Sequence, residues 1–267
     1  LFLYWRGACV SYSINQAASR NIPFDDAKRI IDESFARWMN VQCADTGEAP
    51  GIAVSDAGKA ECDQVIYNPE SPNQNLIVFR DDGWPYSDPN STLGLTTVTF
   101  NAETGEIFDA DMEINASGRN LSITDQVPAN GFDLASVITH EAGHFFGLAH
   151  ATDSKATMFA SYKPGTIALR TLTADDSEGI CAIYPTTATR IVSTAASPTG
   201  KLDATACDPN PRHGLTAKCT EPASSSGGKC EVAPTRASSS SGTSSWLAAL
   251  GALGLIAALR RRVTWRT

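Results

Sequence analysis

The chain has 267 residues, a formal net charge of −8 and 42% hydrophobic residues, which is enough apolar material for an ordinary globular core. Residues 1–186 carry 11 Lys and Arg against 25 Asp and Glu, whereas the remainder carries 10 against 4. An acidic globular part argues against a nucleic-acid partner, because phosphate binding needs a basic surface. Ser, Thr, Ala, Pro and Gly dominate after residue 186, so we expect a globular domain over 1–186 and a flexible linker over 187–245.

Local patterns predict short strands alternating with three helices. In chain order we expect a strand within 4–14, a helix over 25–39 after Pro23, short strands at 51–54 and 75–80, a hairpin of strands at 95–100 and 106–114, a helix capped by Asp133, and a closing helix that ends before Pro185. In the closing helix, Thr173 and Asp176 have the spacing of an N-cap residue and its returning acid.

The second arm of the expected hairpin carries a row of acidic residues. Asp109, Asp111 and Glu113 alternate with other residues, so in a strand they share one face. Such a row could bind calcium, which prefers carboxylate and carbonyl oxygens, but no EF-hand-like loop is present. We therefore expect a solvated strand face.

Seven cysteines bear on the compartment in which the protein works. Those in the expected domain are Cys9, Cys43, Cys62 and Cys181, and those in the tail are Cys207, Cys219 and Cys230. None has C-x-x-C spacing, which argues against a zinc ribbon, and an even number in the domain fits two disulfides in an exported protein. We expect Cys43 to pair with Cys62 and Cys9 with Cys181, although three connectivities are open and buried free thiols are the alternative.

Three of the four histidines fall within eleven consecutive residues that read His-Glu-Ala-Gly-His-Phe-Phe-Gly-Leu-Ala-His. On a helix, positions i and i+4 share a face, so His140 and His144 can offer two nitrogens to one metal ion. Gly147 can take a positive φ and end the helix, which returns His150 as the third ligand. Three nitrogens and one open position are typical of a catalytic zinc. Glu141 follows the first ligand, on the flank from which a carboxylate reaches a metal-bound water.

The competing interpretation is a chance string on a solvated helix. With 4 His and 11 Glu in 267 residues, the expected number of His-Glu-x-x-His strings is about 0.002. Requiring Gly147 and His150 at fixed offsets lowers that number by about three further orders of magnitude. The pattern therefore predicts a metal site.

These residues resemble the metzincin zinc peptidases, and within them the matrixins. The stretch from His140 to His150 resembles the metzincin signature, and seven residues then separate His150 from Met158, as in the matrixin Met-turn. Tyr162 is similar in position to the matrixin residue that forms the wall of the pocket for the residue after the scissile bond. The closing Leu-Thr-Ala-Asp-Asp and Gly-Ile-Cys-Ala-Ile-Tyr segments resemble the matrixin C-terminal helix, so the resemblance covers about residues 1–186.

The resemblance implies an α+β fold with a twisted, mixed five-stranded sheet, three main helices and an active-site cleft between an upper and a lower subdomain. It implies a monomeric zinc endopeptidase that cuts internal bonds of polypeptides, with one catalytic zinc on His140, His144 and His150, Glu141 as general base and Met158 beneath the metal. A structural calcium ion is a further expectation. The chain departs from the family at Ala160, where matrixins usually have Pro, and it has no further histidines for the family's second, structural zinc.

Two other functions are compatible with such a site. One is a catalytically idle zinc-binding module for adhesion or recognition at the cell surface, against which the intact Glu141 argues. The other is a different metal hydrolase, such as an amidase, against which Met158 and the closing helix argue.

The end of the chain, 246–267, combines a short apolar segment with Arg260, Arg261 and Arg262. Its fourteen apolar residues would span about 21 Å as a helix, short of the roughly 30 Å hydrocarbon layer. The segment resembles a bacterial C-terminal sorting tail, except that Cys230 lies far upstream of it. We expect an exported enzyme, secreted or attached to the cell envelope, whose tail meets the membrane or the sorting machinery transiently.

Overall fold

The computed structural model describes residues 1–192 and 200–219 and the backbone of residues 260–266. Its helices are α1 (Phe24–Met39), α2 (Leu134–Phe145) and α3 (Ala174–Ile183), with a 3-10 turn η1 at Ala168–Arg170. Its strands are β1 (Tyr4–Trp5), β2 (Cys9–Asn15), β3 (Ala53–Ala60), β4 (Leu76–Arg80), β5 (Gly94–Asn101), β6 (Glu106–Asn115), β7 (Leu121–Ser122), β8 (Phe132–Asp133), β9 (Thr189–Val192), β10 (Gly200–Asp203) and β11 (Arg260–Arg266).

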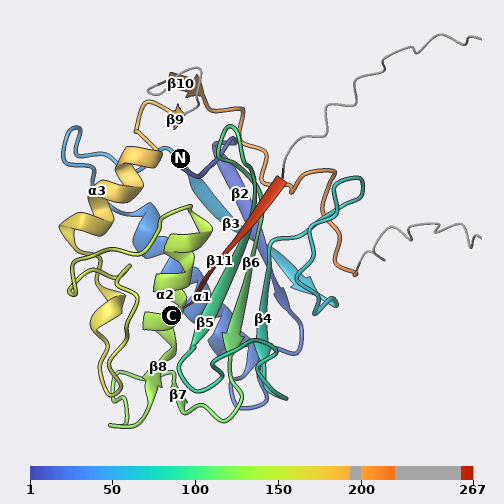
Figure 1. Ribbon diagram of the computed structural model, residues 1–267, viewed down its shortest axis with the longest axis vertical. Helices are drawn as coiled ribbons and strands as arrows, with labels where there is room; N and C mark the ends of the chain where they lie inside the picture. The colour runs from blue at the N-terminus through green and yellow to red at the C-terminus, as the bar shows by residue number, and fades with distance from the viewer. Residues whose placement is uncertain (193–199, 220–259, 267) are drawn as a thin grey trace, which may run out of the picture. The chain divides into compact units, whose positions relative to one another are not determined.

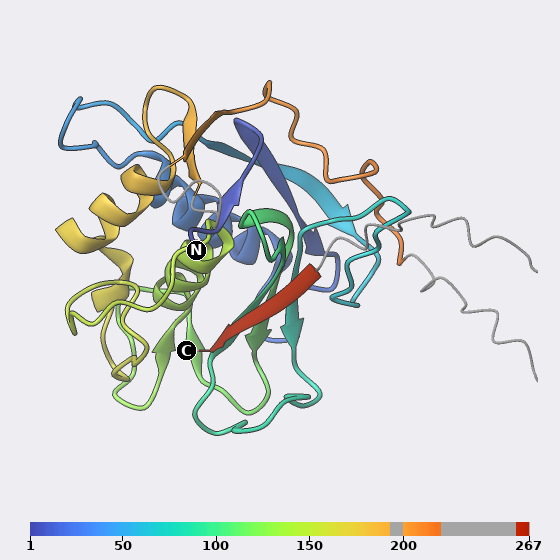
Figure 2. The same ribbon diagram turned by 45° about the horizontal axis from the view of Figure 1, so that its top comes forward.

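One mixed sheet organises the fold, in the order β11-β5-β6-β4-β2-β3, with β1 paired to β6 (Figure 1). The pairs β2–β3, β2–β4 and β4–β6 are parallel, whereas the pair β5–β6 is antiparallel. The five strands β2 to β6 and the three helices confirm the predicted α+β fold. The main sheet contains two further strands: β1 is separate from β2, and β11 lies antiparallel along β5 (Figure 2).

Helices α1 and α2 pack against each other and against the sheet to form the main core. Ile30, Ile31, Phe35 and Trp38 are all buried, as their spacing predicts. The indole of Trp38 donates a hydrogen bond of 2.8 Å to the carbonyl of Thr139 in α2. This contact fixes α2 against α1 along the part of α2 that carries the histidine motif.

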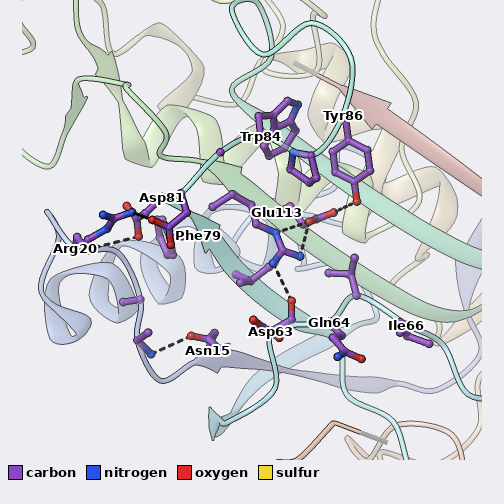
Figure 3. A pocket seen from close by; sticks show the side chains of 18 residues that line it. Asn15, Arg20, Asp63, Gln64, Ile66, Phe79, Asp81, Trp84, Tyr86 and Glu113 are labelled. Carbon is purple, nitrogen blue, oxygen red and sulfur yellow. Dashed lines mark hydrogen bonds and ion pairs between the residues drawn. The ribbon is translucent and has the colours of Figure 1, made fainter. Parts of the chain in front are cut away.

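The acidic row on β6 is buried, so the expectation of a solvated face was wrong. Asp109, Asp111 and Glu113 are each no more than 2% exposed. Glu113 accepts hydrogen bonds from Tyr86 and, at 2.6 Å, from the Arg80 side chain, in the hollow drawn in Figure 3. The alternation correctly predicted that the three acidic residues share one face of the strand. It could not show that segments from other parts of the sequence cover this face.

The disulfide pairing also differs from the expectation. The bridges are Cys9–Cys207, Cys43–Cys181 and Cys62–Cys219, with Cα–Cα distances of 4.7, 5.6 and 4.6 Å. The physical reason is that the tail cysteines lie against the domain, so Cys9 and Cys62 have partners that a count within residues 1–186 leaves out. Cys230 lies outside the described residues.

The first part of the expected linker is folded. Strands β9 and β10 form an antiparallel hairpin, and residues 204–219, which we call the strap, continue along the domain. The strap pairs with the N-terminal segment through Thr205, whose N–H donates to the carbonyl of Arg6 at 3.0 Å. Further along, the N–H of Glu61 donates to Ala217 at 2.7 Å. The rest of the predicted linker, 220–245, lies outside the described residues, and a domain boundary at residue 186 stays a prediction.

The predicted sorting tail is only partly described. Its apolar segment, 246–259, lies outside the described residues, and its arginines begin β11. Within the described ranges, none of the helices combines the length and hydropathy that a membrane span requires.

The disulfide pairing can be tested directly. We expect peptide mapping of the unreduced protein to find the three pairs above, and the Cys62→Ser/Cys219→Ser variant to lose about 2–5 kcal/mol of unfolding free energy, because it loses the closure of a long loop. Urea denaturation measures this loss. A Cys43–Cys62 peptide in the map would contradict the assignment.

Candidate metal centre

Helix α2 is positioned by a strong N-terminal cap. The side chain of Asp133 accepts a hydrogen bond of 2.8 Å from the N–H of Ser136, as predicted for an N-cap residue. The same carboxylate is held by Arg170 at 2.7 and 2.6 Å through two guanidinium nitrogens. Every residue from Leu134 to Phe145 is buried, so the histidine motif lies inside the protein.

The three histidines of the motif converge. The Nε2 atoms of His140 and His144 lie 3.1 Å apart, and those of His144 and His150 lie 3.2 Å apart. Zinc–nitrogen bonds of about 2.05 Å at tetrahedral angles would place two nitrogens about 3.3 Å apart. Among the described residues, these histidines form the one group of three or more His, Cys, Asp or Glu side chains whose ligand atoms lie close enough together to hold a metal ion. The donor set and its spacing therefore fit zinc.

Two backbone carbonyls orient the buried rings. Nδ1 of His140 donates to Thr157 at 2.6 Å, and Nδ1 of His144 donates to Leu148 at 2.8 Å. With the proton on Nδ1, the lone pair of each Nε2 faces the common point between the rings. Burial lowers the pKa of His140 to about 3 and that of His144 well below its usual range. Both rings are consequently neutral at pH 7, which is the form that binds a metal.

The chain turns sharply after α2 to bring His150 back. Gly147 has φ +97°, and its N–H donates to His144 at 2.9 Å. A Cβ at this position would also collide with the carbonyl of Leu3. The expected helix-ending role of Gly147 thus has two causes, the left-handed backbone and the close approach of the N-terminal segment.

Glu141 is buried beside the start of β5. Its carboxylate accepts a hydrogen bond of 2.6 Å from the hydroxyl of Thr96. Gly94 lies so close that a Cβ there would overlap the Glu141 side chain. Sequence reasoning missed Thr96 and Gly94, because nothing in the sequence shows which part of a strand lies beside the helix.

Met158 packs against the histidine helix, and its role as the Met-turn residue beneath a metal stays a prediction. It is 1% exposed, and a Cβ on Gly143 would strike its sulfur. The turn is held by Asp176 of α3, whose carboxylate accepts the N–H groups of Thr157 and Met158 at 2.8 and 3.0 Å. Asp176 also completes the predicted capping box with Thr173. Sequence reasoning did not predict that Asp176 also holds the backbone of Thr157 and Met158, although its place in the expected capping box had singled out this residue.

Tyr162 lies near the beginning of α2. Its hydroxyl accepts the N–H of Asp133 at 3.1 Å and donates to Thr166, and its ring packs on Phe132. A role in a substrate pocket stays a prediction, because these contacts are all within the protein.

The fold and this centre define the class of protein. A mixed sheet, a histidine helix ended by a glycine turn, a third histidine and a methionine turn beneath them are the features of a metzincin-type metallopeptidase domain. Residues 4–185 match the family model of the matrixins, peptidase family M10. The match covers well over half of the 267 residues, and the chain therefore belongs to the matrixin family, which implies one catalytic zinc.

Matrixin relatives occur in plants and animals. The chain is 36% identical over 160 residues to metalloendoproteinase 1 of Glycine max, covering 60% of this chain and 46% of that protein. It is 27% identical over 185 residues to matrix metalloproteinase-C of Caenorhabditis elegans, covering 67% of this chain and 28% of that protein. It is 33% identical over 129 residues to human neutrophil collagenase, covering 48% of this chain and 24% of that protein. The chain spans less than half the length of each of these relatives.

The buried histidines predict how the stability of the metal-free protein depends on pH. In the unfolded chain His140 titrates near 6.5, whereas in the fold its pKa is about 3, so the unfolded state binds more protons between these values. Stability should therefore fall as the pH falls through this window, by about 1.4 kcal/mol per pH unit for such a histidine. Urea denaturation of chelator-treated protein between pH 7 and pH 4 measures the slope. His140→Gln should reduce this slope, and an unchanged slope in that variant would contradict the prediction.

Proposed function

We propose that the protein is a zinc-dependent endopeptidase that hydrolyses internal peptide bonds of proteins. The observation that carries this proposal is the convergence of three imidazole nitrogens beside a buried, oriented carboxylate. His140, His144 and His150 would hold the zinc. When bound, the zinc supplies polarisation of the scissile carbonyl and acidification of a coordinated water.

Glu141 is the proposed general base. Its carboxylate takes a proton from the attacking water and delivers it to the nitrogen of the leaving amine. The hydroxyl of Thr96 keeps this carboxylate in one orientation, and the absence of a side chain on Gly94 leaves room for it. Met158, packed under Gly143, supports the helix that carries both the base and two of the ligands.

The proposed substrate is an extended polypeptide added along β5. Without β11, β5 would be the edge of the sheet, and edge strands bind extended peptides through main-chain hydrogen bonds. Strand β11 occupies this edge antiparallel to β5, with Trp265 opposite Thr96. A polypeptide in the same position lies beside Glu141 and has to displace β11. Tyr162 is the proposed wall of the pocket for the residue after the cleaved bond.

We further propose an exported protein of the bacterial matrixin type, whose segment 246–267 directs it to the cell envelope. Three disulfides fit an oxidising compartment. We expect a monomer, because β11 covers the edge of β5 that would otherwise invite pairing between copies. Fractionation of the producing cells, with mass spectrometry of the C-terminal peptide, tests the location; recovery of the full-length chain only from the cytosol would oppose it.

A mixed peptide library tests the endopeptidase activity. We expect the oxidised full chain with zinc to cut internal bonds, and Glu141→Gln to bind one equivalent of zinc but to lose about 10²–10⁴-fold in rate, the usual contribution of a positioned general base. Mass spectrometry locates the cuts, a chelator should abolish them, and the exposed Glu48→Gln serves as the matched control.

Each outcome of this experiment has a distinct meaning. A Glu141→Gln variant that cuts at the wild-type rate would exclude the proposed base. Zinc binding without any cleavage by the wild-type protein would instead support the second candidate function, a catalytically idle recognition module.

We also propose a structural calcium ion at Asp109 and Asp111. The two carboxyls are buried together, and burial with the charge of Asp109 raises the pKa of Asp111 well above its usual value. Thr99 lies opposite Asp109 on β5, and its buried hydroxyl has no hydrogen-bond partner among the described residues. A set of oxygen donors of this kind suits calcium.

Calcium should therefore stabilise the folded protein. At a calcium concentration of a hundred times Kd we expect a gain of about 2.7 kcal/mol in unfolding free energy, measured by urea denaturation against a chelator. Asp109→Asn should remove the gain, whereas exposed Asp45→Asn should retain it. An equal stability of the wild-type protein with and without calcium would refute this site.

A further inference from the structure

Arg190 lies in β9, beyond residues 4–185 that match the matrixin model, yet its side chain is fully buried. A buried guanidinium is costly unless each of its donors is satisfied. Because this one lies outside the family domain, its role has to be derived from its contacts in this chain.

The guanidinium joins three separate segments of backbone. It donates to the carbonyls of Trp5 at 2.7 Å, Gly7 at 2.8 Å, Gly51 at 3.0 Å and its neighbour Thr189 at 3.0 Å. All of these acceptors are carbonyl oxygens rather than carboxylates. The planar fork of arginine matches several carbonyls at once, which the single ammonium of lysine does not. Arg190 therefore fixes where the N-terminal segment runs.

That segment in turn holds the end of the histidine helix. The indole of Trp5 donates to the carbonyl of Phe145 at 2.8 Å. The hydroxyl of Tyr184, whose ring lies 4.8 Å from the Arg190 guanidinium, accepts the N–H of Trp5 at 3.1 Å and donates to the carbonyl of Phe146 at 2.7 Å. The last carbonyls of a helix have no partner within the helix, so these two bonds cap α2.

The residues just after this cap belong to the metal centre. Gly147 turns the chain where it packs against Leu3. The carbonyl of Leu148 then accepts a hydrogen bond from the Nδ1–H of His144, and His150 follows two residues later. A shift of the N-terminal segment would move the turn and with it the third histidine. Figure 1 shows β9 and the N-terminus close together, above α2.

We propose that Arg190 is a positioning residue for the metal centre: through Trp5 and Tyr184 it sets the end of α2 and hence the place of His150. The consequence is that the segment after residue 185 is needed for a high affinity for zinc. The effect on cleavage rests on the proposed function, whereas the effect on zinc affinity does not.

Zinc affinity of the oxidised full chain tests the proposal. We expect Arg190→Met to weaken the Kd for zinc by about 10- to 100-fold, the range found when the groups that orient metal ligands are removed, with Arg190→Lys recovering part of the loss. Competition with a chromogenic chelator measures the Kd. In the metal-free protein, amide hydrogen exchange of residues 145–150 should accelerate in Arg190→Met.

A matched control separates positioning from general loosening. Cys62→Ser/Cys219→Ser releases the far end of the strap without touching Arg190, so its zinc Kd should stay within about twofold of the wild-type value. An equal loss of zinc affinity in this control, or an unchanged Kd in Arg190→Met, would overturn the proposal.

A second variant keeps the test decisive if Arg190→Met does not fold. Tyr184→Phe keeps the ring and removes only the hydroxyl that bonds Trp5 and Phe146. It should weaken zinc binding and accelerate exchange at residues 145–150, and unchanged values would reject the relay. If zinc affinity changes as expected while no form of the protein cleaves peptides, the proposed function fails and the positioning role stands.

Discussion

Two completely buried imidazole rings, each with its Nδ1 bonded to the backbone and its Nε2 facing the point between the three histidines, are the constraint on which this structure depends. A buried ring N–H needs an acceptor, and here both acceptors are backbone carbonyls of residues that follow the helix, Thr157 and Leu148. The chain therefore has to return to the helix twice. The glycine turn provides one return and the methionine turn the other, so two loops that look separate in sequence serve one electrostatic requirement.

The C-terminal part of the chain supports both returns. Asp176 of α3 uses one carboxylate to begin its own helix and to hold the backbone of Thr157 and Met158. Arg190 of β9 reaches the other return through Trp5 and Tyr184. Segments that contribute no histidine to the centre thus hold the two turns that orient its rings.

What the sequence could predict follows from how local the signals are. The spacing of His140 and His144, the helix break at Gly147 and the cap at Asp133 depend on neighbours within a few residues, and each agrees with the structure. The burial of Asp111 and the partners of Cys9 depend on segments far along the chain. The folded state of residues 200–219 could not be read from composition, because a segment held by disulfides and backbone hydrogen bonds does not need an apolar pattern.

The bridge between Cys9 and Cys207 also constrains the order in which the protein assembles. The two cysteines are 198 residues apart, so the first long strand cannot be locked until almost the whole domain has been synthesised. Contacts of such high sequence separation form late and slowly. The bridge between β2 and the strap can therefore form only after Cys207 has been synthesised and both thiols have met an oxidant.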